Sequence, residues 1–147
     1  MGDDWSSFVQ SQTSRLADGG SSGTAAGYDA IRRGVAIVDR SDRVLLEVAG
    51  ADRATWLHNL TTNEVKNLGA AEGNYAFVLN VKGRILFDVN LCVRPNSILV
   101  DLDGQHLTLA RQHFEKYTIT EDVTVQDHTE TAVRFGLTGP MVPALLE

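Results

Sequence analysis

Residues 74–94, NYAFVLNVKGRILFDVNLCVR, contain the most informative pattern in this sequence. The segments 74–81 and 84–94 are rich in β-branched, aromatic and aliphatic side chains, and a Lys-Gly pair at 82–83 separates them. Two such runs joined by a short turn that contains glycine predict a β-hairpin. A Pro-Asn pair ends the second run, so residues 97–102 (SILVDL) predict a third strand.

Two helices are predicted beside these strands. Asp103 can cap a helix that runs through Tyr117, in which apolar residues recur at helical spacing. Asp52 can cap a second helix, which carries Trp56 and Leu60 on one face. Further strands are predicted at residues 35–38, 43–49, 122–127 and 132–138. Hairpin strands with packed helices predict an α+β fold, with a mixed antiparallel sheet and two or three helices against it.

The two ends of the chain differ from its middle. We expect residues 1–27 to form a flexible amino-terminal arm ahead of a domain at 28–147. Residues 5–16 predict a short helix, whereas 17–27 contain four glycines and no large apolar side chain, which is linker composition. The last segment, 141–147 (MVPALLE), is typical of the first turn of a helix. We therefore expect a partial domain whose fold continues past the last residue.

The composition excludes several classes of protein. The chain has 147 residues, enough for one domain with a sizeable core. Its 19 acidic residues outnumber the 13 lysines and arginines, and a net charge of −6 argues against binding to nucleic acid. Cys92 is the single cysteine, which excludes an internal disulfide and any metal or iron–sulfur site built from several cysteines of this chain.

The sequence also lacks membrane, targeting and metal-binding signals. No apolar run approaches about 18 residues, the length that a membrane helix needs. Residues 1–26 lack the pattern of a signal or transit peptide, so we expect a cytoplasmic protein with no membrane partner. The four histidines lack the spacing of a metal site, so no metal is expected; they are His58, His106, His113 and His128.

The second hairpin strand separates its side chains by parity. One face is entirely apolar and consists of Ile85, Phe87, Val89, Leu91 and Val93. Asp88 and Asn90 are neighbours on the other face, about 6.6 Å apart along the strand. A carboxylate beside an amide on a rigid strand can accept parallel N–H bonds from a planar heterocycle. The alternative is that this face is simply solvated, and Cys92 on the same face is typical of an inert thiol.

Four ordered blocks carry a resemblance to a known family. They are DRSDRVLLEVAGADRATWLHNLTTNEVKNL, GNYAFVLNVKGRILFDV, HFEKYTITEDVTVQD and FGLTGP. From about Tyr28 to Glu147 the chain resembles the amino-terminal folate-binding region of the glycine-cleavage T-protein superfamily. That group includes aminomethyltransferases, regions of dimethylglycine and sarcosine dehydrogenases, and the YgfZ-type iron–sulfur maintenance proteins. The resemblance implies an α+β domain that encloses a tetrahydrofolate cavity together with a later small barrel.

Within this group the hairpin is more similar to the YgfZ-type branch. The aminomethyltransferases typically have two glycines and two adjacent acids there. Here Arg84 stands in place of the second glycine and Phe87 in place of the first acid, so Asp88 alone keeps the acidic role. In the T-proteins an acid on this strand lies at the folate and is needed for transfer, and Asp88 matches it best. The resemblance thus implies these cofactor-binding residues: Asp88, which is also the catalytic candidate, Asn90, Leu79, Leu86 and Arg84.

The resemblance leaves three functions open. The first is a YgfZ-type protein that binds tetrahydrofolate or a one-carbon derivative and supports iron–sulfur enzymes, its client proteins. The second is an aminomethyltransferase, which would meet a lipoyl carrier protein and use the carboxylate of Asp88 for proton movement. The third is a structural remnant without activity.

Overall fold

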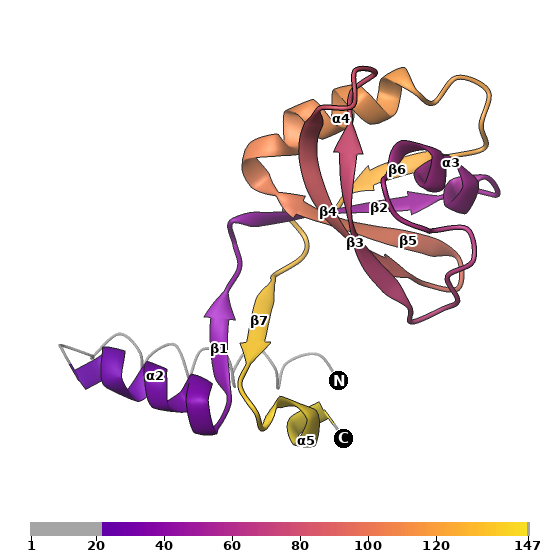
Figure 1. Cartoon of the computed structure of the whole chain (residues 1–147). Helices are drawn as coiled ribbons and strands as arrows, with labels where there is room; N and C mark the ends of the chain where they lie inside the picture. The colour runs from indigo at the N-terminus through magenta and orange to yellow at the C-terminus, as the bar shows by residue number, and fades with distance from the viewer. Residues whose placement is uncertain (1–21, 147) are drawn as a thin grey trace. The chain divides into compact units, whose positions relative to one another are not determined.

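Residues 22–146 are described by the structure, a computed structural model, and they belong to two compact units (Figure 1). The larger unit runs from Arg40 to Arg134. The smaller unit combines the residues up to Asp39 with those from Phe135 onward. Each unit has its own sheet, so each is described by itself.

The larger unit is built on a five-stranded antiparallel sheet with the strand order β3-β4-β5-β2-β6. Its strands are β2 (Arg43–Ala49), β3 (Gly73–Leu79), β4 (Ile85–Val93), β5 (Ser97–Asp103) and β6 (Thr124–Asp127). β3 and β4 form the predicted hairpin, and β5 pairs with β4 as the third strand. The predicted α+β fold is therefore confirmed.

Helix α4 (Leu107–Lys116) lies against one face of this sheet and follows a short 3-10 helix, η1 (Gly104–His106) (Figure 1). Strand alternation places one set of apolar side chains under α4, where Ala110 and Phe114 complete the core. The buried apolar strand residues are Val44, Leu46 and Val48 of β2, Ala76 and Val78 of β3, Phe87, Val89 and Leu91 of β4, and Ile98, Val100 and Leu102 of β5. Asp103 accepts a hydrogen bond from the Gln105 N–H at 2.9 Å and so caps η1, which leads into α4. The residue directly before α4 is His106, whose side chain makes no capping hydrogen bond.

The predicted cap of the other helix, α3 (Arg53–Leu60), is wrong. Asp52 precedes α3, but its side chain makes no capping hydrogen bond. Its backbone is already helical (φ −89°, ψ −1°), whereas a capping side chain needs an extended residue to reach the free amides. The carboxylate instead accepts the backbone N–H of Asp122 at 2.8 Å and so joins the start of α3 to the segment before β6.

The predicted apolar face of β4 needs one correction. Phe87, Val89 and Leu91 are buried as predicted, but Ile85 is 60% exposed. The pairing with β3 passes from Val78↔Phe87 to Leu79↔Ile85, which leaves Leu86 as an extra residue. Such a bulge breaks the strict alternation, so parity no longer predicts which face Ile85 occupies.

The smaller unit contains two short strands and two helices. Its elements are α2 (Ser22–Arg33), β1 (Ala36–Asp39), β7 (Phe135–Thr138) and α5 (Val142–Leu146). β1 and β7 correspond to the predicted strands at 35–38 and 132–138, although β7 begins only at residue 135. The two strands pair antiparallel. The helix start predicted at 141–147 corresponds to α5.

Helix α2 corrects the predicted extent of the linker. Residues 22–27 have linker composition, yet they form the first half of this helix. Alanine is the strongest helix former, and the two alanines in this segment lead into a helical turn that ends with two arginines. Asp29 and Arg33 add an exposed ion pair one turn apart, at 3.6 Å. The helix predicted at residues 5–16 lies outside the described residues.

Candidate functional site

The candidate site lies on the face of the five-stranded sheet opposite α4. The strand register places Tyr75 beside Asn90 and Phe77 beside Asp88. The same register places Asn90 beside Asp101 of β5. Because side chains of paired residues point to the same face, aromatic, acidic and amide groups gather there.

Asp88 is half-buried in this group, and its charge acts on the hydroxyl of Tyr75. The pKa of Tyr75 is raised, first by loss of hydration and then by the charge of Asp88 and a hydrogen bond to its carboxylate. A phenol is protonated at neutral pH, so the Tyr75 hydroxyl can donate to the carboxylate of Asp88. This contact leaves the carboxylate with further acceptor positions on the open side.

The two aromatic residues of β3 form a surface beside the acid. The rings of Tyr75 and Phe77 lie 5.3 Å apart in an edge-to-face arrangement. Tyr75 is 49% exposed and Phe77 is half-buried. An exposed aromatic surface next to fixed hydrogen-bond acceptors is a typical arrangement for holding a flat ring.

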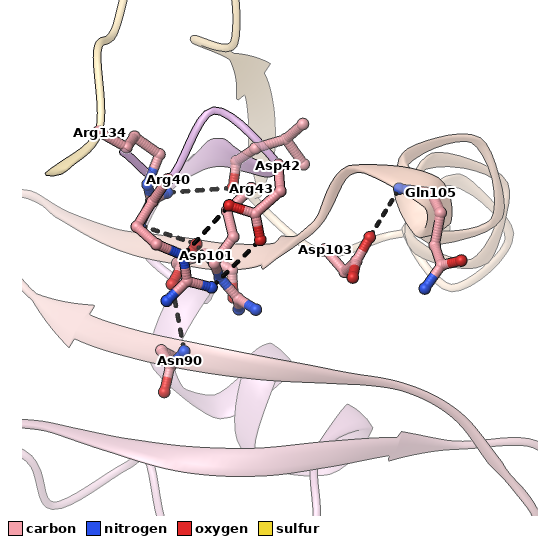
Figure 2. Close-up of polar contacts among 9 residues, drawn as sticks. Arg40, Asp42, Arg43, Asn90, Asp101, Asp103, Gln105 and Arg134 are labelled. Atoms are coloured by element: carbon pink, nitrogen blue, oxygen red, sulfur yellow. Dashed lines mark hydrogen bonds and ion pairs between the residues drawn. The ribbon is translucent and has the colours of Figure 1, made fainter. Parts of the chain in front are cut away.

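A charged network adjoins this surface (Figure 2). Asp101 Oδ1 accepts from Arg43 Nε at 2.8 Å and lies 2.7 Å from Arg134 Nη2. Its other oxygen, Oδ2, accepts from the Asn90 side-chain amide at 3.1 Å. Arg40 and Asp42 form a separate exposed ion pair at 3.1 Å.

A second polar cluster lies on the same face between β2 and β6. Glu47 accepts from Ser97 Oγ at 2.5 Å and lies 2.9 Å from His128 Nε2. The serine and the histidine both contact the acid and are not bonded to each other, so this is not a nucleophile–base arrangement. The pKa of Glu47 is lowered, chiefly by the Ser97 hydrogen bond and then by His128.

Glu47→Gln is expected to lower the free energy of unfolding by roughly 1 kcal/mol at pH 7, the usual worth of such a hydrogen-bonded acid. A carboxyl whose pKa is lower in the folded state stabilises above its ordinary value, here 4.5, and loses that contribution as the pH falls through the lowered value. Urea unfolding at pH 7 and pH 3 should therefore show the two proteins converging in acid. A constant difference between them would contradict this role for Glu47.

Comparison with known families decides the family of this chain. The GCVT N-terminal domain model matches residues 6–147. The chain belongs to the GCVT N-terminal domain family. The predicted resemblance to the T-protein superfamily is thus confirmed.

Curated relatives of this GCVT N-terminal domain include two kinds of protein. The mouse mitochondrial iron–sulfur cluster assembly factor IBA57 is 35% identical over 119 residues, covering 71% of this chain and 33% of that protein. An aminomethyltransferase of Rubrobacter xylanophilus is 29% identical over 125 residues, covering 85% of this chain and 34% of that protein. The chain therefore spans about a third of the length of these relatives.

A solved structure supports the fold. The glycine cleavage system aminomethyltransferase T of Bartonella henselae superposes with a TM-score of 0.74 and 20% identity. The match covers 82% of this chain and 33% of that one. At this identity the likeness shows that the GCVT N-terminal domain has the T-protein fold.

The structure brings some predicted site residues of this GCVT N-terminal domain together and separates others. Asp88 and Asn90 share the open face, as parity predicts. Leu86 is the extra residue of the β4 bulge and packs partly against the core. Arg84 is exposed at the end of the hairpin turn. Leu79 lines a hollow of about 240 Å³ together with His113 and other residues, and Asp88 is not among them.

Sequence reasoning missed four members of the open face. Tyr75 and Phe77 alternate along β3 and could have been found by the same parity argument as Asp88. Asp101 interrupts the apolar run of β5, which was a second usable signal. Arg134 follows β6 and no local pattern points to it, because only the strand order brings it to Asp101. Within residues 22–146 no group of three or more His, Cys, Asp and Glu residues could hold a metal ion, and none of the helices there is long and apolar enough to cross a membrane.

Proposed function

We propose that this chain binds tetrahydrofolate or a one-carbon derivative on the open face of the five-stranded sheet, and that it serves iron–sulfur enzymes as a YgfZ-type protein. The observation that carries the proposal is the half-buried carboxylate of Asp88 beside the aromatic side chains of Tyr75 and Phe77. A pterin is flat and offers an exocyclic amine next to a ring N–H, which suits a carboxylate acceptor beside an aromatic surface.

Each residue has a defined task in this proposal. Asp88 accepts the paired N–H groups of the pterin, while Tyr75 donates to the carboxylate and keeps it in place. Phe77 and the Tyr75 ring cover one side of the heterocycle. Arg84, which is exposed at the end of the hairpin turn before β4, supplies a cation for the carboxylates of the folate tail. Bound folate would supply the carrier of a one-carbon unit.

Burial of Phe87 favours this function over aminomethyl transfer. Phe87 stands where the transferases have the first of two acids, and here it is 2% exposed. Its ring lies 6.1 Å from that of Phe114 and 6.3 Å from that of His106, inside the core under α4. The chain therefore presents one carboxylate at this point instead of a pair. The IBA57 proteins of mouse and human, both described as iron–sulfur cluster assembly factors, are each 35% identical to this chain, against 29% for the Rubrobacter aminomethyltransferase.

Asp88→Asn is expected to weaken tetrahydrofolate binding by roughly 10- to 100-fold, because charge-assisted hydrogen bonds contribute about 1.5–3 kcal/mol. Isothermal titration calorimetry of the whole chain measures this change. Glu115→Gln is the matched control, since Glu115 is an exposed acid on α4. Absence of saturable binding to the wild type, or equal affinities for wild type and Asp88→Asn, would overturn the proposal.

Aminomethyl transfer remains the second candidate because relatives named aminomethyltransferase match 85% and 86% of this chain. Asp88 would then assist proton movement during transfer to folate. Release of ammonia and methylenetetrahydrofolate from an aminomethylated lipoyl carrier protein would establish it. If the protein shows neither folate binding nor aminomethyl transfer, the third hypothesis, a structural role, is the one that stands.

A further inference from the structure

The side chain of Asn90 has a fixed orientation on the open face. Its Nδ2 donates to Asp101 Oδ2 at 3.1 Å. A carboxylate accepts hydrogen bonds and has none to donate, so the amide must turn its NH₂ group toward Asp101. The carbonyl oxygen, Oδ1, consequently points away from Asp101. Asn90 is exposed, so this oxygen is available to a ligand.

Asp101 is itself held from two sides (Figure 2). Arg43 donates from Nε to Asp101 Oδ1 at 2.8 Å and from Nη2 to the Asp101 backbone carbonyl at 3.1 Å. Arg134 Nη2 lies 2.7 Å from the same Oδ1, and its Nη1 donates to the carbonyl of Val44 at 3.2 Å. These three side chains are 11–22% exposed, so solvent competes little with their contacts.

The network therefore restricts the side-chain amide of Asn90 to one of the two orientations that an isolated asparagine can adopt. A free amide can rotate and offer either its NH₂ group or its oxygen, and so can bind a donor or an acceptor. Because the guanidinium groups of Arg43 and Arg134 fix Asp101, the Asn90 NH₂ group stays on Asp101 and only Asn90 Oδ1 faces the open surface. The result is a second acceptor two residues along β4 from Asp88.

We propose that Asp101, held by Arg43 and Arg134, orients Asn90 so that the open face presents two acceptors, Asp88 and Asn90 Oδ1, to the N–H edge of a bound heterocycle. Asp101 and its two arginines are positioning residues that act through Asn90. This inference rests on the proposed function for the identity of the ligand. It adds that the face selects rings with several N–H donors on one edge and rejects rings whose matching edge carries acceptors.

Ligand discrimination tests the role of the network. Wild-type protein should bind tetrahydrofolate at least about tenfold more tightly than an analogue that lacks the exocyclic 2-amino group, because the analogue leaves an acceptor unpaired. In Asp101→Asn the preference should become smaller, since an amide at 101 accepts as well as donates and lets Asn90 rotate. It should not disappear, because Asp88 still accepts from the N–H groups of the ligand. Arg134→Gln should reduce it in the same direction. Equal weakening of both ligands would show a merely structural role and overturn the inference.

A measurement without ligand separates this inference from the proposed function. In a ¹⁵N-labelled sample the Asn90 side-chain amide, assigned by its loss in Asn90→Ala, should exchange with solvent about tenfold more slowly in wild type than in Asp101→Asn or Arg134→Gln. Arg40→Gln is the control, because Arg40 pairs with Asp42 and makes no hydrogen bond to Asp101. An unprotected amide in the wild type would overturn the inference even if tetrahydrofolate binds. Failure of tetrahydrofolate to bind would overturn the proposed function, and the exchange rate would still decide the orientation of Asn90.

Discussion

Phe87→Asp is expected to lower the free energy of unfolding by more than about 4 kcal/mol, which is a large part of the stability of a domain of this size. Phe87 is 2% exposed and packs among the rings of His106, His113 and Phe114. The substitution removes an aromatic ring from the core and places a carboxylate there without a cation or donor. Urea unfolding followed by far-ultraviolet circular dichroism measures the loss.

The control for this prediction is Phe87→Leu, which keeps an apolar side chain and is expected to cost about 1–2 kcal/mol. A Phe87→Asp protein with near wild-type stability would show that position 87 can host an acid. The pair of adjacent acids that the resemblance associates with transferases would then be compatible with this core, and burial of Phe87 would no longer favour a binding protein over an enzyme.

Gly50→Ala is expected to lower the free energy of unfolding by about 2–4 kcal/mol, the sum of a strained backbone and a steric clash. Gly50 has φ +113°, and a Cβ there would lie 2.0 Å from the carbonyl oxygen of Asp122. That oxygen accepts the N–H of Asp52, and the Asp122 carboxylate accepts the N–H of Ala51. The clash would therefore separate the segment before β6 from the corner between β2 and α3.

Gly83→Ala separates the cost of the strained backbone from the cost of the steric clash. Gly83 also has a positive φ, +76°, but a Cβ there meets nothing within 4 Å. Its substitution should cost about 1 kcal/mol, the conformational part alone. Equal losses for the two variants would contradict the steric argument at Gly50.

Local patterns were sufficient for much of the fold. The hairpin at β3 and β4 follows from two apolar runs and a turn, and the cap at Asp103 follows from its place before a periodic helix. These features depend on residues close together in the chain. Where a distant segment competes for a side chain, local reasoning fails: Asp52 binds the backbone of Asp122 and so does not cap α3.

Sequence patterns also failed to predict two small departures from the expected local structure. Parity assigned Ile85 to the core, but the extra residue in β4 turns it to solvent. Glycine content assigned residues 22–27 to a linker, but a helix that is stable further along can extend through alanines into such a segment.

For the candidate site, the amino-acid sequence by itself determined that Asp88 and Asn90 lie on one face of a strand, because successive side chains in a strand alternate. The tertiary structure alone decided what those side chains meet. Arg43 and Asp101 are 58 residues apart in the chain, and Arg134 comes from beyond β6. Their contacts exist because β2 pairs with both β5 and β6, and long-range pairing of strands has no local periodicity from which it can be predicted.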